Sequence, residues 1–435
     1  MNLVNSVIQR NSRLPLFILP DKQINIFDIL DAQRIYSGLL NVVAGNRIAL
    51  CIQSVSTLAK LIILLDGVCL EITLMPRELS VDEIKKLLIN SNVQGVISDY
   101  LTDEICPVQL IPLNESSGNL PLYEFETVWK LPTSGTTGAP KLISHKISSL
   151  SKTVKPVSDK GLSLCWGTFY DIGRFAGLQV YLQAVLGGSS LALTDNSEMS
   201  LSEIISALHA AGVNALSATP TMWQKILMTC GSECLNLKQI TLGGEIVRQR
   251  VIDALSVRYP EARITHIYAS TEFGVAFSIT DRMEGFPSEW IDGDYSIGRI
   301  DIDSGELLLR KDNEWVATGD VVEEHSGRIL FQGRLNGSIN VGGNKVMPEE
   351  VEKILLQYPG VQMVSVSSQK SSFMGNLVQA EIMATLNTSQ EEYRIDLIAY
   401  CRQHLDAYKV PMFIKFVNDI STSSTGKILR KGGNA

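Results

Sequence analysis

The feature that most limits the fold is an alternation of strand-like and helix-like segments through the first three quarters of the chain. An apolar run at Arg47–Ile52 is short enough for a strand, and the next segment, 56–70, is long enough for a helix. Ser80 and Glu83 form a capping box that opens a helix over 81–90, before a strand at 93–98. The same rhythm recurs at 202–218 and 249–268. Strands that alternate with helices favour parallel α/β layers.

A different pattern begins near residue 297, where helical periodicity ends and short strands separated by Gly and Asp turns follow. A smaller unit is predicted after Arg334. Pro348 suits a first helical position, and Glu349 and Glu350 suit the positive end of a helix. Apolar residues then share one face of that helix, at Val351, Ile354, Leu355 and Tyr358. Strands at 361–366, 377–385 and 412–417 and a helix at 391–404 complete a compact α+β module.

Composition excludes several classes of protein. The chain has 435 residues, more than one hydrophobic core usually supports, and its 45% hydrophobic and 19% charged residues are typical of a globular protein. A net charge of -8 gives no basic surface for nucleic acid or anionic lipid. The N-terminus lacks a signal-peptide layout. Seven scattered cysteines favour free thiols in a reducing compartment, so we predict a cytoplasmic protein with no membrane and no nucleic-acid partner.

The segment from Thr133 to Lys141 is the strongest sign of chemistry. It combines four hydroxyl side chains, two glycines and one lysine, which together can surround a polyphosphate with N–H, O–H and ammonium donors. The spacing is not that of a Walker loop, because Gly135 and Gly138 are too close and Lys141 follows a proline. A solvated Ser/Thr/Gly turn is the plain alternative.

Four more clusters follow in the chain. Ile267–Gly274 carries an aromatic ring, hydroxyls and a carboxylate at a strand end, where open α/β sheets bind ligands. Asp320 is predicted on a tight turn in Ala317–Asp320. Phe331–Glu352 runs into the smaller unit, and Ser421–Arg430 ends in a Thr-Gly-Lys sequence. Each has a plain structural explanation when it is taken alone.

Together and in this order, the five motifs resemble the adenylate-forming superfamily of acyl-CoA synthetases, peptide-synthetase adenylation domains and luciferases. The resemblance runs from Arg47 to Lys427. It implies an α/β fold with a large N-terminal domain of layered sheets and helices, residues 1–335, and a small mobile C-terminal α+β domain, residues 336–435. It also implies that ATP and Mg²⁺ activate a carboxylic acid as acyl-AMP, with release of pyrophosphate, before a thiol captures the acyl group.

The resemblance assigns nucleotide-binding roles to particular residues. The β- and γ-phosphates are expected to contact Thr133, Ser134, Gly135, Thr136, Thr137, Gly138 and Lys141. Adenine is expected to stack on Tyr268, in a pocket lined by Gly243, Gly244 and Glu245, with Ser270 in the same motif. Thr271 matches the residue at the α-phosphate, and Glu272 matches the magnesium carboxylate. Asp320 is expected to take both ribose hydroxyls with help from Arg334, and Lys427 to stabilise charge during adenylation.

The same resemblance makes Asn336 the hinge and places Gly342, Gly343 and Lys345 in a segment used during thioester formation. We predict that the paired glycines let a pantetheine arm pass close to the backbone, although a plain hairpin turn explains them equally simply. Ala269 stands where glycine is usual, and Ser421 stands where proline is usual. Neither change removes a catalytic group.

The acyl pocket is expected within Trp166–Leu186, with Asp171, Arg174 and Phe175 as candidates. Amino-acid-activating members carry an aspartate there, but their usual Phe-Asp-x-Ser pattern is missing, so the sequence favours an aryl or short acyl acid without an α-amino group. Phe169, Tyr170, Phe175 and Trp223 are either an apolar pocket wall or plain core.

The thiol acceptor is expected to be CoA or the phosphopantetheine of a separate carrier protein, because no carrier domain follows Lys427. The short chain suggests secondary metabolism. Three alternatives remain at this stage: an amino-acid adenylation enzyme, a non-catalytic nucleotide-binding relative, and, more remotely, a P-loop kinase or ATPase. Neither His145 nor His266 is assigned a catalytic role.

Overall fold

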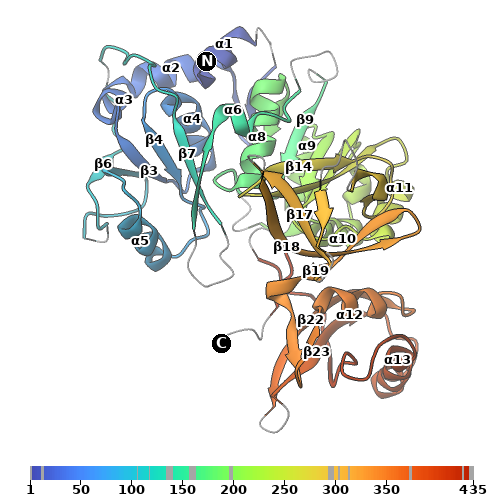
Figure 1. The fold of residues 1–435 in the computed structure, drawn as a ribbon. Coiled ribbons are helices and arrows are strands. Elements are labelled where there is room, and N and C mark those ends of the chain that lie inside the picture. Colours follow the sequence, from blue (N-terminus) through green and yellow to red (C-terminus); the bar gives the residue numbers. More distant parts are fainter. Residues whose placement is uncertain are drawn as a thin grey trace. The chain divides into compact units, whose positions relative to one another are not determined.

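The alternation of strands and helices produces two mainly parallel sheets in the N-terminal part of the chain, and two mainly antiparallel sheets follow (Figure 1). The structure is a computed structural model. It describes residues 2–10, 14–104, 106–116, 118–133, 141–155, 163–194, 199–291, 298–301, 304–311, 314–371, 375–423 and 426–430.

The chain forms two compact units. Unit 1 contains Met1–Gly244 and Asp253–Arg282, and unit 2 contains Glu245–Ile252 and Met283–Ala435. The predicted boundary between residues 335 and 336 lies inside unit 2. The predicted boundary marks the point about which the small domain would move, whereas the two units are defined by packing. The boundary therefore stays a prediction.

The first sheet of unit 1 has the strand order β6-β5-β3-β4-β7-β8. Its strands are β3 (Arg47–Cys51), β4 (Glu71–Leu74), β5 (Gly95–Ser98), β6 (Leu110–Pro112), β7 (Val128–Pro132) and β8 (Leu142–Lys146). Neighbouring strands run parallel except β7 and β8, which form an antiparallel hairpin at one edge. The predicted helix after Ser80 is confirmed as α5 (Val81–Asn90), with its capping box.

The second sheet of unit 1 has the order β14-β13-β12-β11-β9-β10-β1-β2. Its strands are β1 (Phe17–Ile18), β2 (Gln23–Ile24), β9 (Cys165–Thr168), β10 (Ser190–Ala192), β11 (Ala215–Ala218), β12 (Gln239–Gly243), β13 (Arg263–Ser270) and β14 (Gly274–Ile279). The pairs along β13-β12-β11-β9-β10-β1 are all parallel, and the two edge strands, β14 and β2, are antiparallel partners of β13 and β1. Each parallel sheet therefore ends in a hairpin.

Helices connect and cover these strands. They are α1 (Leu3–Gln9), α2 (Ile26–Ile35), α3 (Ser37–Val43), α4 (Val55–Leu65), α6 (Ile147–Leu150), α8 (Phe175–Gly187), α9 (Leu201–Ala210), α10 (Pro220–Met228), η1 (Ser232–Cys234) and α11 (Gln249–Arg258). In Figure 1 α8 lies between β7 and β9. The Tyr181 hydroxyl on α8 donates to the Ala59 carbonyl on α4 over 2.6 Å, which joins helices of the two sheets. The predicted α/β class is confirmed.

Helix α4 is shorter than predicted, because Asp66 follows Leu65 and ends the helix. Its carboxylate is buried and accepts from the Trp129 Nε1 at 3.1 Å and from the Leu3 backbone N at 2.9 Å. Burial raises the pKa of Asp66 to about 6, while these two donors act in the opposite direction. The segment predicted as helical from 67 to 70 instead turns at Gly67, which has a φ of +87°.

Unit 2 begins with an antiparallel sheet of order β15-β19-β18-β17-β16. Its strands are β15 (Phe286–Pro287), β16 (Gly298–Ile300), β17 (Glu306–Lys311), β18 (Glu314–His325) and β19 (Arg328–Arg334), with η2 (Ser288–Trp290) beside them. The prediction that Asp320 lies on a tight turn is wrong, since Asp320 lies within β18. Gly319 before it has a φ of +79°, and the pairing of β18 with β17 shifts register here. The strand therefore continues through a local irregularity and does not end in a turn.

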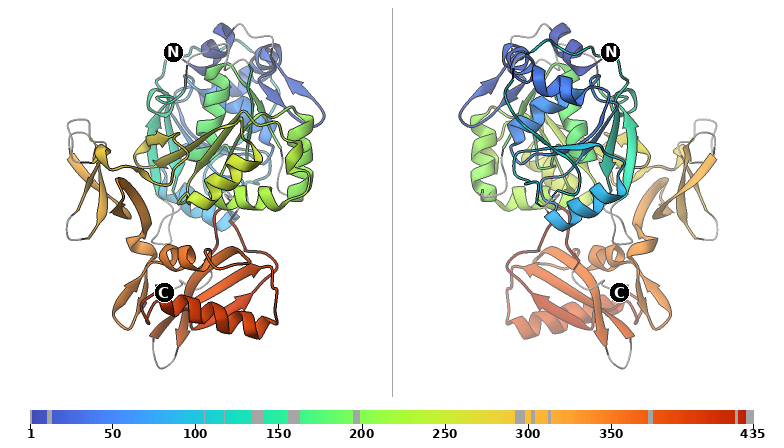
Figure 2. Two further views of the ribbon diagram at one scale, coloured as in Figure 1. Left: turned by 90° about the vertical axis from the view of Figure 1, so that its right-hand side faces the viewer. Right: turned by 90° about the vertical axis from the view of Figure 1, so that its left-hand side faces the viewer.

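The second sheet of unit 2 has the order β21-β20-β23-β22, with β24 beside β23. Its elements are η3 (Leu335–Gly337), β20 (Ile339–Val341), β21 (Asn344–Val346), α12 (Pro348–Leu355), β22 (Val361–Ser371), β23 (Gly375–Ala384), α13 (Gln390–His404) and β24 (Phe413–Phe416). The orange and red part of the ribbon in Figure 2 contains them. The α+β pattern is confirmed, except that α12 ends at Leu355, before Tyr358. The Tyr358 ring instead packs edge-on against Tyr393 of α13.

Two further findings concern the whole chain. All seven cysteines are free thiols, and burial raises the pKa of Cys401 to about 11. Within the parts of the chain that are described, no helix combines the length and apolar character that a membrane crossing requires.

Candidate functional site: a nucleotide-binding site

Strands β7 and β8 flank the hydroxyl- and glycine-rich segment in the chain. The two strands stay paired as far as Pro132 and Leu142, and the Thr133 N–H then donates to the Lys141 carbonyl over 2.8 Å. The loop is thus closed at its base by main-chain hydrogen bonds. Its predicted phosphate-binding members Ser134, Gly135, Thr136, Thr137 and Gly138 lie outside the described residues.

The Tyr-Ala-Ser-Thr-Glu motif lies at the tip of the second hairpin, β13–β14. Tyr268 stacks on Phe277 of β14 with ring centroids 5.1 Å apart, and the register shifts directly after it, at Ala269. The Ser270 Oγ accepts from the Phe273 N–H over 3.1 Å, which fixes the turn. Glu272 is exposed within that turn. Ser270 therefore has a clear structural task in addition to its predicted nucleotide role.

A side-chain hydrogen bond links the ends of β9 and β12, which lie on either side of β11 in the same sheet. The Tyr170 hydroxyl, two residues after β9, donates to the carbonyl of Gly243, the last residue of β12, over 3.0 Å. Gly244 follows with a φ of +83°, a conformation that favours glycine. The predicted Gly243–Gly244 segment thus lies at the edge of the sheet where parallel strands end, the usual ligand side of such sheets.

Two ion pairs join the β9–α8 connection to the residues after β4. Asp171 accepts from the Arg77 Nε at 3.0 Å and from the Arg77 N–H at 3.2 Å, and it also accepts from the Gly173 N–H at 2.6 Å. Arg174 pairs with Glu78. Two of the three candidates for the acyl pocket are therefore paired with protein side chains. Neither Arg77 nor Glu78 was predicted as a partner, since charged residues after a strand carry no distinctive spacing.

The aromatic candidates for the acyl pocket are all buried. Phe175 begins α8, and its ring lies 5.7 Å from that of His145 on β8. Trp223 is completely buried, and its Nε1 donates to the Thr241 carbonyl over 3.0 Å. The core interpretation therefore fits Trp223. His266 is also buried, on β13, as a packed side chain.

In unit 2 Asp320, the predicted ribose-binding carboxylate, lies opposite Arg334, which is predicted to assist it. Asp320 and Arg334 face each other across β18 and β19, and the Arg334 Nε donates to the Asp320 Oδ1 over 2.7 Å. The carboxylate is 10% exposed and the guanidinium 57% exposed. The Asp320 N–H also donates to the Thr318 Oγ1. A nearly buried carboxylate with a fixed orientation suits a pair of hydroxyl donors.

The hinge and thioester candidates are also in unit 2. Asn336 lies in the single turn η3. Gly342 and Gly343 form the two-residue turn between β20 and β21, with φ values of +57° and +91°, so the hairpin interpretation is confirmed for these two residues. Lys345 is exposed on β21. A side chain added at Gly343 would meet no atom within 4 Å.

Lys427 lies in a small hairpin whose arms meet at Thr422 and Ile428. Glu245, whose predicted place in the adenine pocket stays a prediction, accepts a hydrogen bond from the Ile428 N–H over 2.9 Å. Arg430 binds Glu352 and Glu349 of α12. From the sequence, Glu349 was predicted only as a helix-start residue and Glu352 only as the end of the Phe331–Glu352 motif, and their partner was not predicted.

Comparisons with known proteins show which family the chain is similar to. The AMP-binding enzyme family matches residues 79–348. A 2-succinylbenzoate–CoA ligase of Staphylococcus aureus strain JH9 is 24% identical, over 78% of this chain and 72% of its own. A 3,4-dihydroxybenzoate–[aryl-carrier protein] ligase of Bacillus anthracis is also 24% identical, over 89% of this chain and 90% of its own.

Solved structures share the fold. An anthranilate CoA ligase in complex with anthranoyl-AMP superposes with a TM-score of 0.79 at 16% identity, covering 98% of this chain and 95% of its own. An o-succinylbenzoate CoA synthetase from Bacillus subtilis, in complex with its acyl-adenylate, gives a TM-score of 0.74 at 18% identity, with coverages of 98% and 97%. The family match spans more than half of the chain and includes Tyr268, Glu272 and Asp320. The protein is a member of the AMP-binding enzyme family, within the adenylate-forming superfamily.

Proposed function

We propose that this enzyme is an ATP-dependent ligase that joins a carboxylic acid to a thiol through an acyl-AMP intermediate. The observation that carries the proposal is the family match over residues 79–348, which contains the aromatic, acidic and ribose-binding candidates in the expected order. The names of the two relatives described above, both acid–thiol ligases, support it.

The chemistry requires charge neutralisation and alignment rather than proton transfer. A carboxylate attacks the α-phosphate of ATP, and both groups are anions, so their approach must be stabilised by positive charge and oriented donors. In this proposal Tyr268 and Gly243–Gly244 bind adenine, Asp320 and Arg334 bind ribose, and Thr271 contacts the α-phosphate. Lys427 contributes the positive charge during adenylation.

Magnesium is part of this proposal, and the residues present fit it. Mg²⁺ usually binds nucleotides through one or two protein carboxylates together with phosphate oxygens and water. Glu272 is an exposed carboxylate on a hairpin tip, and no cluster of three or more His, Cys, Asp or Glu side chains that could hold a metal occurs in the described part of the chain. A bound magnesium ion would neutralise phosphate charge, and Glu272 would keep it on the nucleotide.

The acid is proposed to lack an α-amino group. Both oxygens of Asp171 already accept hydrogen bonds from Arg77 and the Gly173 N–H, so the carboxylate that would hold a substrate ammonium is committed to a protein cation. Freeing Asp171 would leave Arg77 without this partner, which is costly for a half-buried charge. An aryl or short acyl acid fits best, as the names of the relatives also suggest. Amino-acid adenylation is the alternative.

The acceptor is proposed to be CoA or the phosphopantetheine of a separate carrier protein, since the two named relatives use one each. We place the enzyme in the cytoplasm, where seven free cysteines remain reduced. Secondary metabolism remains our proposed setting.

An ATP–pyrophosphate exchange screen across aryl, fatty and amino acids tests the proposal. We expect exchange with one group of acids, most strongly aryl or short acyl acids. Exchange with amino acids alone would replace our substrate class with the alternative. ADP and orthophosphate as products, or no exchange with any acid, would contradict acyl-adenylate formation and favour a kinase-like or non-catalytic protein.

A further inference from the structure

The lysine hairpin, which we define as residues 421–423 and 426–430, is held together by its own main chain. The Ser423 N–H donates to the Lys427 carbonyl over 2.8 Å, and the Leu429 N–H donates to the Ser421 carbonyl over 2.9 Å. Gly426 supplies the turn with a φ of +73°. These bonds fix the shape of the hairpin.

Two carboxylate contacts attach the arm that follows Lys427 to the rest of unit 2. The Ile428 N–H donates to the Glu245 Oε1 over 2.9 Å, directly after the lysine. Three residues after it, the Arg430 Nη2 lies 2.9 Å from the Glu352 Oε2 and 3.1 Å from the Glu349 Oε1. Burial alone would lower the pKa of Arg430, but the charges of Glu352 and Glu349 raise it above its ordinary value.

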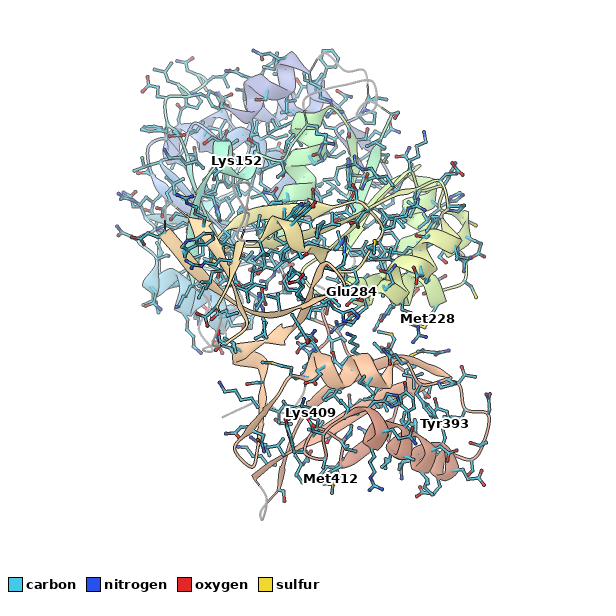
Figure 3. The ribbon with its side chains drawn as sticks, turned by 45° about the vertical axis from the view of Figure 1, so that its right-hand side comes forward. Lys152, Met228, Glu284, Tyr393, Lys409 and Met412 are labelled. Atoms are coloured by element: carbon cyan, nitrogen blue, oxygen red, sulfur yellow. The ribbon has the colours of Figure 1, made fainter. Side chains whose placement is uncertain are left out.

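The segment that carries Glu245 is itself fixed to the same part of unit 2. Arg248 donates to the carbonyls of Phe331 and Glu349, each over 3.1 Å, and its Nη1 also lies 3.0 Å from a Glu284 oxygen. Glu284 is labelled in Figure 3. Arg250 likewise donates to the Leu356 carbonyl over 2.6 Å and to that of Val361 over 3.0 Å. The residues that follow Glu245 are therefore attached to unit 2 through Arg248 and Arg250.

We propose that Glu245 is a positioning residue for Lys427, which it orients by holding the adjacent Ile428 N–H, and that it does not bind the nucleotide. The proposal rests on the proposed function, in which Lys427 acts during adenylation. A lysine side chain has four rotatable bonds, so holding its ammonium group at one position costs conformational entropy. A fixed main chain beside Lys427 lowers this cost, because fewer backbone conformations compete with the active one. Arg430 holds the arm at a second point, against α12.

The attachment can be measured without any substrate. Hydrogen exchange of the C-terminal peptides, followed by mass spectrometry, reports the Ile428 amide directly. We expect Glu245→Ala to speed exchange at this amide at least tenfold, whereas Glu245→Gln, which keeps an acceptor oxygen, remains close to wild type. Glu83→Ala is the matched control: Glu83 also accepts a backbone N–H, in the capping box of α5. Unchanged exchange in Glu245→Ala would overturn the attachment.

Kinetics then separate positioning from nucleotide binding. Loss of the contact is expected to lower kcat for ATP–pyrophosphate exchange about tenfold in Glu245→Ala, with KM for ATP within twofold of wild type and substantial rescue in Glu245→Gln. In a Lys427→Ala background, Glu245→Ala should have no further effect, because its influence passes through that lysine. A raised KM for ATP with unchanged kcat, or additive losses in the double variant, would overturn the proposal.

The two kinds of failure can be distinguished. If the wild-type enzyme shows no exchange with any acid, the proposed function fails, while the hydrogen-exchange result still decides whether Glu245 holds the hairpin. If the wild type is active but Glu245→Ala behaves like wild type in both assays, only the positioning role is lost.

Discussion

The two units hold their predicted site residues by different means. In unit 1 main-chain pairing of β7 with β8 flanks the predicted phosphate-binding segment, and pairing of β13 with β14 holds the Tyr268–Glu272 motif at the sheet edge. In unit 2 the corresponding groups depend on charge: Arg334 pairs with Asp320, and Arg430 binds α12. Main-chain pairing persists when a side chain is replaced, whereas an ion pair is lost when either partner is replaced. Single substitutions should therefore disturb the position of the site residues more in unit 2 than in unit 1.

Lys427→Ala should produce the largest loss. Removing a charge that stabilises the transition state typically costs about 3–4 kcal/mol, so adenylate formation should fall by a hundredfold or more while ATP binding persists. Pyrophosphate exchange at saturating ATP measures it. Lys415→Ala is the control, since Lys415 is an exposed lysine of β24 with a 3.6 Å contact to Glu381. A Lys427→Ala enzyme within twofold of wild type would remove Lys427 from the reaction.

Gly343→Leu tests whether the β20–β21 turn has a role beyond closing a hairpin. We expect exchange to persist and thioester formation to fall at least tenfold, with Asn336→Pro acting similarly by fixing φ at the hinge. Gly343 has a positive φ, so a leucine there could act by straining the backbone as well as by blocking the path of the thiol, and the two effects must be separated. Gly343→Asn is the control, since asparagine tolerates this conformation. Equal losses in both half-reactions would end the two-conformation interpretation.

Glu272→Gln tests the hairpin tip in unit 1. A neutral amide is a poor ligand for a hard divalent cation, so the magnesium concentration for half-maximal exchange should rise about tenfold with the fold intact. Circular dichroism checks the fold, and Glu261→Gln, another exposed position of unit 1, is the control. An unchanged magnesium titration would mean that the ligand lies elsewhere.

Asp320→Ala should raise the KM for ATP roughly tenfold with a smaller change in kcat, because ribose hydrogen bonds exist in ground and transition states alike. The same change leaves Arg334 without the Asp320 carboxylate that it contacts at 2.7 Å, so Arg334→Ala should partly reproduce it. If KM for ATP stays the same in both variants, neither residue belongs to the nucleotide site.

Asp66→Asn should have the smallest effect at neutral pH and the clearest pH signature. The pKa of Asp66 is about 6 in the folded protein, above the ordinary value of about 3.9, so the folded state binds this proton more tightly. The free energy of unfolding should therefore decrease as pH rises from about 4 to 6, and this slope should be reduced in the variant. Urea unfolding across this range measures it, and identical slopes would contradict the shift.

Local chemistry explains what the sequence could predict. The capping box at Ser80 and the proline start of α12 act through neighbouring residues, so their helices begin where expected. The end of α4 could not be predicted, because it depends on Asp66 meeting Trp129 and Leu3, each 63 residues away. Asp320 was misplaced on a turn because Gly319 suggested one, whereas pairing with β19 keeps the segment in a strand.

The candidate site divides in the same way. Tyr268, Glu272 and Lys427 could be named because their motifs are contiguous. The partners of Asp171 and Arg430 could not, since Arg77 and Glu352 lie 94 and 78 residues away in sequence. Charged pairs of this kind are set by how strands and helices are brought together, and a single sequence carries no local mark of them.

The two edge hairpins have a consequence for how such an enzyme changes over evolutionary time. A loop that is closed at its base by paired strands can grow or shrink at low thermodynamic cost, about 0.6 kcal/mol for each doubling in length. The base of the β7–β8 loop is sealed by the Thr133–Lys141 hydrogen bond, so insertions beyond it do not reach the sheet. Changes in the length of these connections can therefore accumulate while the interior of unit 1 remains unaltered.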